Sequence, residues 1–132
     1  MLPRTKARKR ALDILHAADV TATSPLEIVS LEDEPIQPFA REIIIGVVEH
    51  LADIDALIRE YADRWPLERM PVVDRNLLRI ALFEILFGTD TPPGVAINEA
   101  VDLAKMLSTE DSGRFINGLL GRVARERGIG AR

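Results

Sequence analysis

The amino-acid sequence predicts an all-α fold, a compact bundle of six or seven helices. Apolar residues recur at spacings of three and four along almost the whole chain, and no segment alternates apolar and polar residues as a half-buried strand does. With 132 residues, of which 47% are hydrophobic and 29% charged, the chain is long enough to bury a core of its own. Because it contains no internal repeat, linker or low-complexity tract, we expect one domain over residues 1–132.

The first helix is expected over residues 4–20 and has two distinct faces. Its apolar stripe consists of Ala7, Ala11, Ile14, Leu15 and Ala18. At about 100° per residue, Lys6, Lys9 and Arg10 fall on the opposite side, and Arg4 and Arg8 flank the stripe. The pattern therefore predicts an amphipathic helix with a cationic outer face.

Prolines and capping residues set the next elements. Ser24, Pro25 and Glu27 are typical of a helix start with a capping box, and they predict a short helix that ends before Pro35. A long helical segment is expected over about residues 38–63, with a bend or break in its middle, where two aspartates weaken helix propensity. A short helical or 3₁₀ piece follows between two prolines, at positions 66 and 71.

Three helices complete the prediction. Residues 72–88 are apolar nearly all round, which is typical of a central, buried helix. After a proline-rich turn, the next helix covers residues 95–107, with a core face made of Ile97, Ala100, Val101, Ala104 and Leu107. Residues 108–112 are rich in N-cap residues and start a last helix, about 111–126, which Gly128 and Gly130 end.

The composition argues against several classes of protein. Zero cysteines exclude a disulfide scaffold, a thiolate nucleophile and a cysteine-ligated zinc site. His16 and His50 lie 34 positions apart and form no metal motif. His16 is expected at the core edge of the first helix, and His50 is expected to be exposed. Without a phosphate-binding loop or a catalytic signature motif, we expect no enzyme, no cofactor and no metal site.

No apolar run approaches the roughly 20 residues needed to span a bilayer, and the basic N-terminus lacks the apolar core of a signal peptide. We therefore expect a soluble cytoplasmic protein with no membrane partner.

The net charge of −4 hides a strong asymmetry along the chain. Residues 1–10 hold five basic groups and no acid, and residues 114–132 hold five arginines against Glu126. The stretch 11–113 holds 7 basic and 20 acidic groups, a net charge of −13. Basic ends on an acidic body indicate a polyanionic partner at the ends, and the body suits a basic protein partner.

The last predicted helix has an unusual outer stripe, made of Arg114, Gly118, Gly121, Arg122 and Arg125. It lies opposite the expected core residues Phe115, Ile116, Leu119 and Val123. Each glycine costs a helix up to about 1 kcal/mol relative to alanine, so two on one face indicate close approach of another body. That body is either another helix of the same chain or an RNA or protein partner.

Several motifs together resemble the NusB transcription antitermination proteins. They are RKRALDIL at residues 8–15, VDRNLLRIALFEIL at 73–86, VAINEAVDLAK at 95–105 and EDSGRFINGLL at 110–120. Their order and spacing match essentially the whole chain. The resemblance implies an all-helical, non-catalytic factor that binds boxA-type RNA together with NusE, a small-subunit ribosomal protein. The pair helps an RNA polymerase complex read through termination signals, notably in ribosomal RNA operons.

The resemblance and the charge pattern together give candidate site residues. For RNA these are Arg4, Lys6, Arg8, Lys9, Arg10, Asp111, Arg114, Phe115 and Arg122. Stacking of RNA bases would use Phe115, Tyr61 or arginine planes. For NusE the resemblance implies the start of the central helix, at Asp74 and Arg75, with His16 nearby. His16 stands where these proteins commonly have an aromatic residue.

Two alternatives remain at this point. One is a helical protein–protein adaptor whose basic ends are incidental. The other is an RNA-binding module of the kind that precedes ribosomal RNA cytosine methyltransferases; because the chain ends at Arg132 without a catalytic domain, we favour the free-standing factor. Members of this family differ in self-association, so the sequence leaves homo-oligomerisation open.

Overall fold

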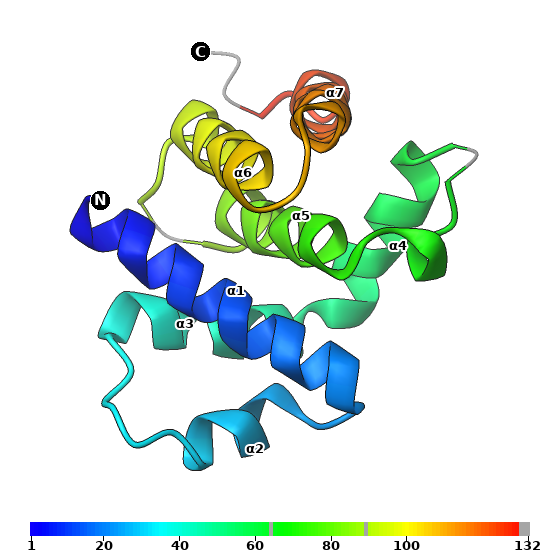
Figure 1. Cartoon of the computed structure of the whole chain (residues 1–132). Coiled ribbons are helices and arrows are strands. Elements are labelled where there is room, and N and C mark those ends of the chain that lie inside the picture. Colours follow the sequence, from blue (N-terminus) through cyan, green and yellow to red (C-terminus); the bar gives the residue numbers. More distant parts are fainter. Residues whose placement is uncertain (64, 89, 130–132) are drawn as a thin grey trace.

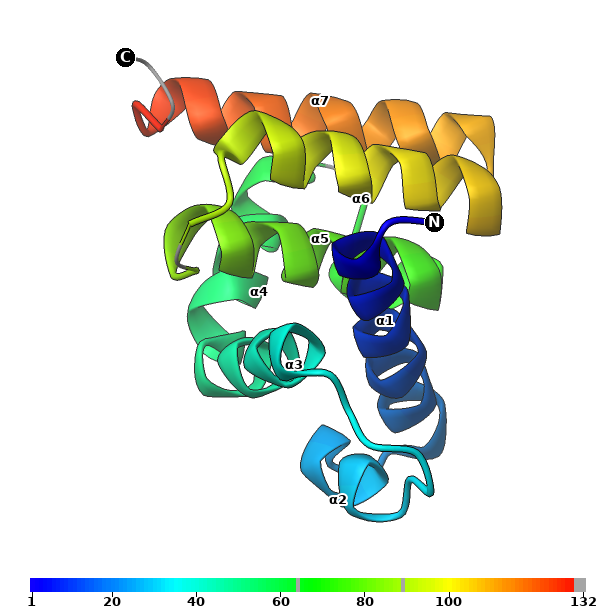
Figure 2. The same cartoon turned by 90° about the vertical axis from the view of Figure 1, so that its left-hand side faces the viewer.

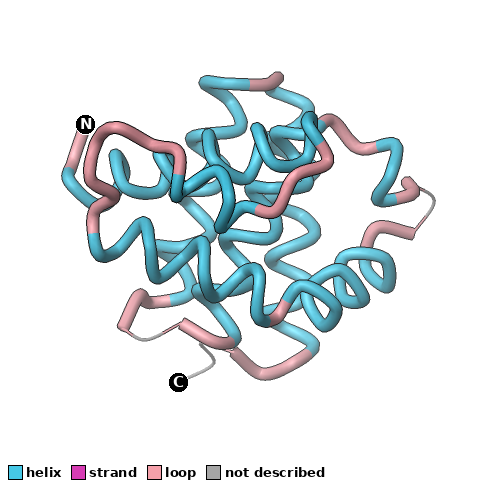
Figure 3. Tube along the Cα trace, turned by 90° about the horizontal axis from the view of Figure 1, so that it is seen from below, coloured by secondary structure: helices cyan, strands magenta, loops and turns pink. Residues whose placement is uncertain are grey.

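The computed structural model describes residues 1–63, 65–88 and 90–129, so Gly130 and Arg132, used above, lie outside the described residues. These ranges contain helices and no strand, which confirms the predicted all-α class (Figure 3). The elements are α1 (Pro3–Thr21), α2 (Pro25–Ser30), α3 (Pro38–Glu49), α4 (Leu51–Tyr61), the 3₁₀ turn η1 (Leu67–Arg69), α5 (Val72–Leu86), α6 (Pro93–Leu107) and α7 (Glu110–Glu126).

Helix α5 is the centre of the molecule, as its apolar sequence predicts. Every residue from Asn76 to Glu84 is buried. Helices α1 and α3 pack on one side of α5, and α6 and α7 lie on the other (Figures 1 and 2). Gly46 permits the close approach of α3, because a Cβ atom at this position would collide with the ring of Phe83.

The apolar stripe predicted for the first helix is confirmed, and that of the last helix is confirmed except at Phe115, which is only partly buried. All five stripe residues of α1 are buried, and on α7 the side chains of Ile116, Leu119 and Val123 are buried. Helix α7 packs mainly along α6 (Figure 2). This arrangement leaves the outer face of α1 and the upper face of α7 at the surface.

The long helical segment breaks at His50, a few residues before the two aspartates where a break was expected. His50 has φ −109° and ψ 16°, and it separates α3 from α4. Its ring stacks on Phe87 with 3.9 Å between the ring centroids. The expectation that His50 is exposed is therefore wrong, because the turn places this ring against the end of α5.

Two local predictions also need correction. Ser24 precedes α2 as expected, but its side chain makes no capping hydrogen bond, so the capping box is not formed. Helix α6 buries Ala96 and Leu103 in addition to the predicted Ala100 and Ala104. The buried face of α6 is wider than predicted because α6 packs against both α5 and α7.

Candidate nucleic-acid interface

The outer face of α1 carries the cations that the sequence predicts there. Lys6 is exposed, and Lys9 and Arg10 are partly buried. Lys9 pairs with Asp13 one turn along the helix, at 2.8 Å. Arg10 reaches Glu32 at 3.3 Å and Glu34 at 3.7 Å, in the connection between α2 and α3. These three cations line one open groove between α1 and that connection. Glu32 and Glu34 would therefore compete with a bound phosphate for the charge of Arg10.

Arg4 lies at the start of the same helix and remains accessible. Its guanidinium pairs with Asp90 at 3.2 Å and lies 4.4 Å from the centre of the Phe39 ring. The side chains of Arg4 and Asp90 are 51% and 66% exposed. Ion pairs this exposed contribute at most about 1 kcal/mol, so Asp90 can give up Arg4 to an RNA phosphate at small cost.

Arg8 does not belong to this outer face, and here the sequence-based assignment to RNA needs correction. The Arg8 side chain is 3% exposed and makes a bidentate pair with Glu84, at 2.8 and 2.9 Å. Its third hydrogen bond goes to Glu99 at 2.7 Å, an oxygen that also accepts a hydrogen bond from Thr5. Arg8 therefore joins α1 to α5 and α6 inside the protein, where burial keeps its guanidinium away from a phosphate.

The electrostatics of Arg8 fit this internal role. Burial alone would lower the pKa of its guanidinium, but the hydrogen bonds and charges of Glu84 and Glu99 outweigh that effect and raise the pKa. The Arg8 guanidinium therefore stays charged beside its two carboxylate partners. Buried charges are tolerated in proteins when they are paired and hydrogen-bonded in this way.

The start of α7 forms a second candidate surface. Thr109 caps the helix, since its Oγ1 accepts a hydrogen bond from the Ser112 backbone N–H at 2.9 Å. Asp111 and Arg114 are both exposed and pair with each other across one turn. Phe115 is partly buried, with its ring packed edge-on against Trp65 at a centroid distance of 4.6 Å. Phe115 therefore combines a packing role with partial accessibility.

Lys105 is a cation at this surface that the sequence analysis did not single out. A Cβ atom at Gly113 would lie 2.8 Å from Lys105 Cγ and 3.2 Å from its Cε. The lysine stem thus lies across the first turn of α7, next to Arg114. Gly113 leaves room for the lysine stem, and this glycine is visible in the sequence. Its role can be recognised only from the structure, because the contact depends on the packing of α6 against α7.

The outer stripe of α7 is open to solvent at its centre. A Cβ atom at Gly118 would meet nothing within 4 Å, so none of the other described helices packs there. At Gly121 the nearest neighbour is the flexible end of Arg125, at 3.1 Å. None of the described helices therefore accounts for the two glycines.

Arg122, assigned to RNA from the sequence, is engaged by its neighbours. It pairs with Asp63 at 3.2 Å and Glu126 at 3.5 Å, and its guanidinium lies 5.1 Å from the Tyr61 ring centre. Tyr61 is 5% exposed. The phenol ring is therefore unsuited to base stacking, whereas Arg122, at 39% side-chain exposure, still offers donor atoms to solvent.

Asp74, assigned to the protein partner, is inaccessible. It is 0% exposed, and its Oδ2 accepts a hydrogen bond from Ser112 Oγ at 2.7 Å. The assignment of Asp74 as a direct partner contact is wrong because α7 covers it. From the sequence alone, an aspartate at a helix start is expected to be exposed and favoured by the helix dipole. The sequence does not show that a later helix, α7, lies over it.

Arg75 is partly buried beside this aspartate and belongs to a cluster of charged groups between α1, α4 and α5. Asp19 Oδ2 accepts hydrogen bonds from Arg75 and Arg79, each at 3.0 Å, and from Asn76 at 2.8 Å. Arg79 also makes a bidentate pair with Asp55, at 2.9 and 3.1 Å. Burial raises the pKa of Asp19, but the hydrogen bonds and positive charges around it outweigh that and hold the pKa below its usual value.

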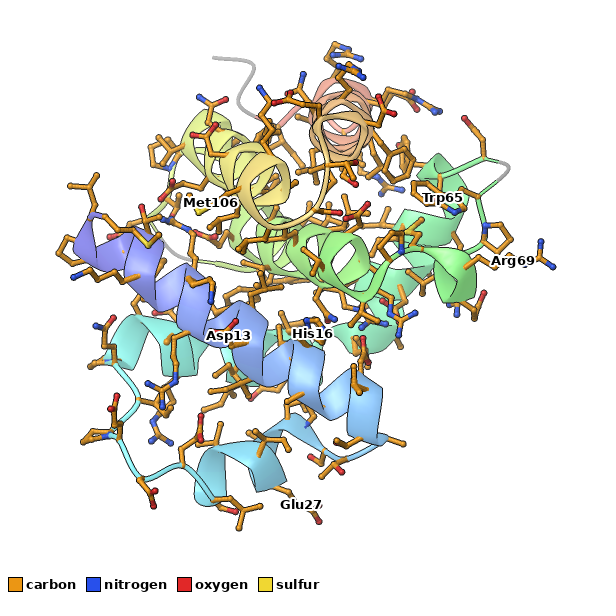
Figure 4. All side chains as sticks on the ribbon, in the orientation of Figure 1. Asp13, His16, Glu27, Trp65, Arg69 and Met106 are labelled. Atoms are coloured by element: carbon orange, nitrogen blue, oxygen red, sulfur yellow. The ribbon has the colours of Figure 1, made fainter. Side chains whose placement is uncertain are left out.

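His16, the third residue assigned to the partner, is partly buried on α1, the helix that packs against α5 (Figure 4).

In the described ranges no group of three or more His, Cys, Asp or Glu side chains is placed to hold a metal ion. None of the described helices combines the length and apolarity that crossing a bilayer requires.

Comparisons with known proteins agree on one family. The model of the NusB family matches residues 5–125. A protein of Clavibacter sepedonicus, named transcription antitermination protein NusB, is 50% identical over 94% of this chain and 97% of its own length. A protein of the same name from Kineococcus radiotolerans is 47% identical over 94% of each chain.

Solved structures of NusB proteins also match this chain. NusB of T. maritima superposes with a TM-score of 0.82 at 39% identity, covering 95% of this chain and 92% of that one. A chain from the crystal structure of the antitermination factors NusB and NusE in complex with dsRNA superposes with a TM-score of 0.79 at 27% identity. That match covers 93% of this chain and 96% of the other.

Proposed function

The chain belongs to the NusB family, and from that premise we propose that it is an RNA-binding transcription antitermination factor. It binds a boxA-type segment of nascent RNA together with NusE, and the pair acts on an RNA polymerase complex to promote read-through of ribosomal RNA operons. This function is exercised where transcripts are made, in the cytoplasm. We further propose that residues 1–132 act as one RNA-binding domain without catalytic activity.

One observation carries the RNA part of this proposal: the outer face of α1 gathers cations on a protein whose body is acidic. Single-stranded RNA needs cations along its phosphates, and Lys6, Lys9 and Arg10 supply them on one helix face. Arg4 extends this face by one turn. Arg8 supports the surface from inside, because it ties α1 to α5 and α6.

The start of α7 supplies the second part of the proposed surface. Arg114 and Lys105 add positive charge at the N-terminus of α7, the end of the helix dipole that favours a phosphate. Asp111 opposes a phosphate by its charge, so we assign it to an amino group on a base edge. Phe115 and Arg122 complete the proposed RNA residues, the first beside Trp65 and the second further along the helix.

For NusE we propose the acidic body, near the start of α5. A basic ribosomal partner is attracted by the net charge of −13 over residues 11–113, which mainly raises the association rate and falls with salt. Arg75 and His16 remain candidate contacts. Asp74 is left out because it is buried.

A binding titration tests this proposal. A labelled boxA-type RNA is titrated with the chain alone and with equimolar NusE, beside a scrambled RNA of equal length. We expect tighter binding of the boxA-type RNA, and a further gain in affinity when NusE is present. Equal and weak binding of both RNAs, with NusE bound normally, would favour the helical adaptor instead.

A further inference from the structure

Asp74 is a buried acid with an incomplete set of partners. Its side chain is 0% exposed, and Ser112 Oγ, at 2.7 Å, donates the hydrogen bond that its Oδ2 accepts. Its other oxygen, Oδ1, is buried and has no hydrogen-bond partner among the residues that the structure describes. Burying a carboxylate costs free energy, and two apolar side chains of similar shape would serve stability as well or better. Stability alone therefore does not explain this pair.

The position of the pair suggests what it does. Helices α5 and α7 run in the same direction and begin at the same end of the molecule (Figure 2). Asp74 lies in the first turn of α5 and Ser112 in the first turn of α7. The hydrogen bond thus joins the two helix starts, one next to Arg75 and the other next to Asp111.

Ser112 also organises the connection that leads into α7. Its hydroxyl lies 3.0 Å from both Ser108 Oγ and Thr109 Oγ1, and its backbone N–H is bonded by the capping oxygen of Thr109. A single buried hydroxyl therefore links α5, the turn between α6 and α7, and the first turn of α7. When this hydroxyl is fixed, the neighbouring Asp111 and Arg114 are fixed with it.

We propose that Asp74, through Ser112, is a positioning residue for RNA binding: it holds the first turn of α7 in the place where its side chains meet RNA. This inference rests on the proposed function but makes a separate claim about α7. Asp74 itself contacts no RNA and no partner. Its acceptor oxygen, and not its surface charge, is what the site requires.

Trp65 provides a probe of this positioning that does not depend on RNA. It is the single tryptophan of the chain, and its ring packs against Phe115, one turn after Ser112. A shift of the first turns of α7 changes the surroundings of this indole. Its emission spectrum therefore reports where α7 begins, both with and without ligand.

The experiment compares four variants of the full chain. Ser112→Ala removes the donor, and Asp74→Asn keeps an acceptor oxygen of the same shape. Asp74→Leu combined with Ser112→Ala replaces both partners by apolar groups. Ile44→Val, in a helix that packs mainly against α1 and α5, is a mildly destabilised control. For each variant we measure the thermal midpoint, the Trp65 emission and the affinity for boxA-type RNA with NusE.

We expect Ser112→Ala to shift the Trp65 emission and to weaken RNA binding by about three- to thirtyfold. Asp74→Asn should stay within about twofold of the unmodified chain, and the control should keep its RNA affinity. The double variant should have a thermal midpoint close to that of the unmodified chain. Its RNA affinity should stay low, because the hydrogen bond that joins the starts of α5 and α7 is still missing.

Each other result counts against the inference. Recovery of RNA affinity together with stability in the double variant would reduce Asp74 to a packing residue. Unchanged Trp65 emission in Ser112→Ala would overturn the link itself, whatever the RNA does. Failure of the unmodified chain to bind RNA would refute the proposed function. The Trp65 emission of the variants would still test whether the Asp74–Ser112 hydrogen bond positions α7.

Discussion

Replacement of Arg8 by alanine separates an internal ion pair from an RNA contact. The change leaves Glu84, which is 4% exposed, and Glu99, whose side chain is 20% exposed, without the cation that neutralises them. Removal of one partner of a buried ion pair typically costs about 3–5 kcal/mol. For a domain of this size that corresponds to a fall in thermal midpoint of roughly 10–20 °C.

The assay is thermal and urea denaturation followed by circular dichroism, with Arg4→Ala as the matched control on the same helix. The Arg4 pair with Asp90 is exposed, so this control should lose at most about 1 kcal/mol of unfolding free energy. RNA affinity is measured at low temperature, where both variants stay folded. If Arg8→Ala is no less stable than Arg4→Ala yet loses as much RNA affinity, Arg8 is an RNA contact and the internal assignment is wrong.

Three further changes have outcomes that the structure fixes. Glu32→Gln with Glu34→Gln frees Arg10 from its acidic neighbours, so RNA affinity should rise by about two- to fivefold in a low-salt titration; a fall would mean that these acids order the groove. Gly118→Ala should raise the unfolding free energy of the isolated chain by roughly 0.5–1 kcal/mol in thermal denaturation, since the added Cβ meets open space; a loss would contradict the open face. Because the folded-state pKa of Asp19 is lowered, its contribution to stability is present above its unfolded pKa of about 3.9 and is lost as the pH falls through the folded value. Asp19→Asn should therefore have a lower unfolding free energy than the unmodified chain at pH 6 in urea denaturation. The difference between the two chains should shrink below about pH 4.

Periodicity predicted the helices because burial of one face repeats along a helix. The central place of α5 follows from a sequence that is apolar nearly all round, since only a helix covered on every side tolerates such a surface. The break at His50 could not be read in the same way. It depends on a ring stack with Phe87, which lies 37 positions later in the chain.

The candidate site was harder to predict because its charges are sorted by distant partners. On a helical wheel Arg8 lies at the border of the apolar stripe, and a basic side chain there reads as outward-pointing. It turns inward because the fold brings Glu84 and Glu99 to it, from 76 and 91 positions away. Asp74 is hidden for the same kind of reason, since Ser112 arrives only with the last helix. Lys6, Lys9 and Arg10 lie on the side of the helix away from the stripe, and their position at the surface agrees with the pattern.

The central claim is that the outer face of α1 binds RNA phosphates. It is tested most directly by RNA affinity as a function of salt, for the unmodified chain and for a variant with Lys6→Ala, Lys9→Ala and Arg10→Ala. Each phosphate contact contributes about −0.7 to the slope of log K against log salt on single strands, so loss of three contacts should flatten the slope by about 2. Affinity should fall for every RNA sequence tested, while NusE binding stays intact. An unchanged slope with unchanged affinity would remove α1 from the RNA site.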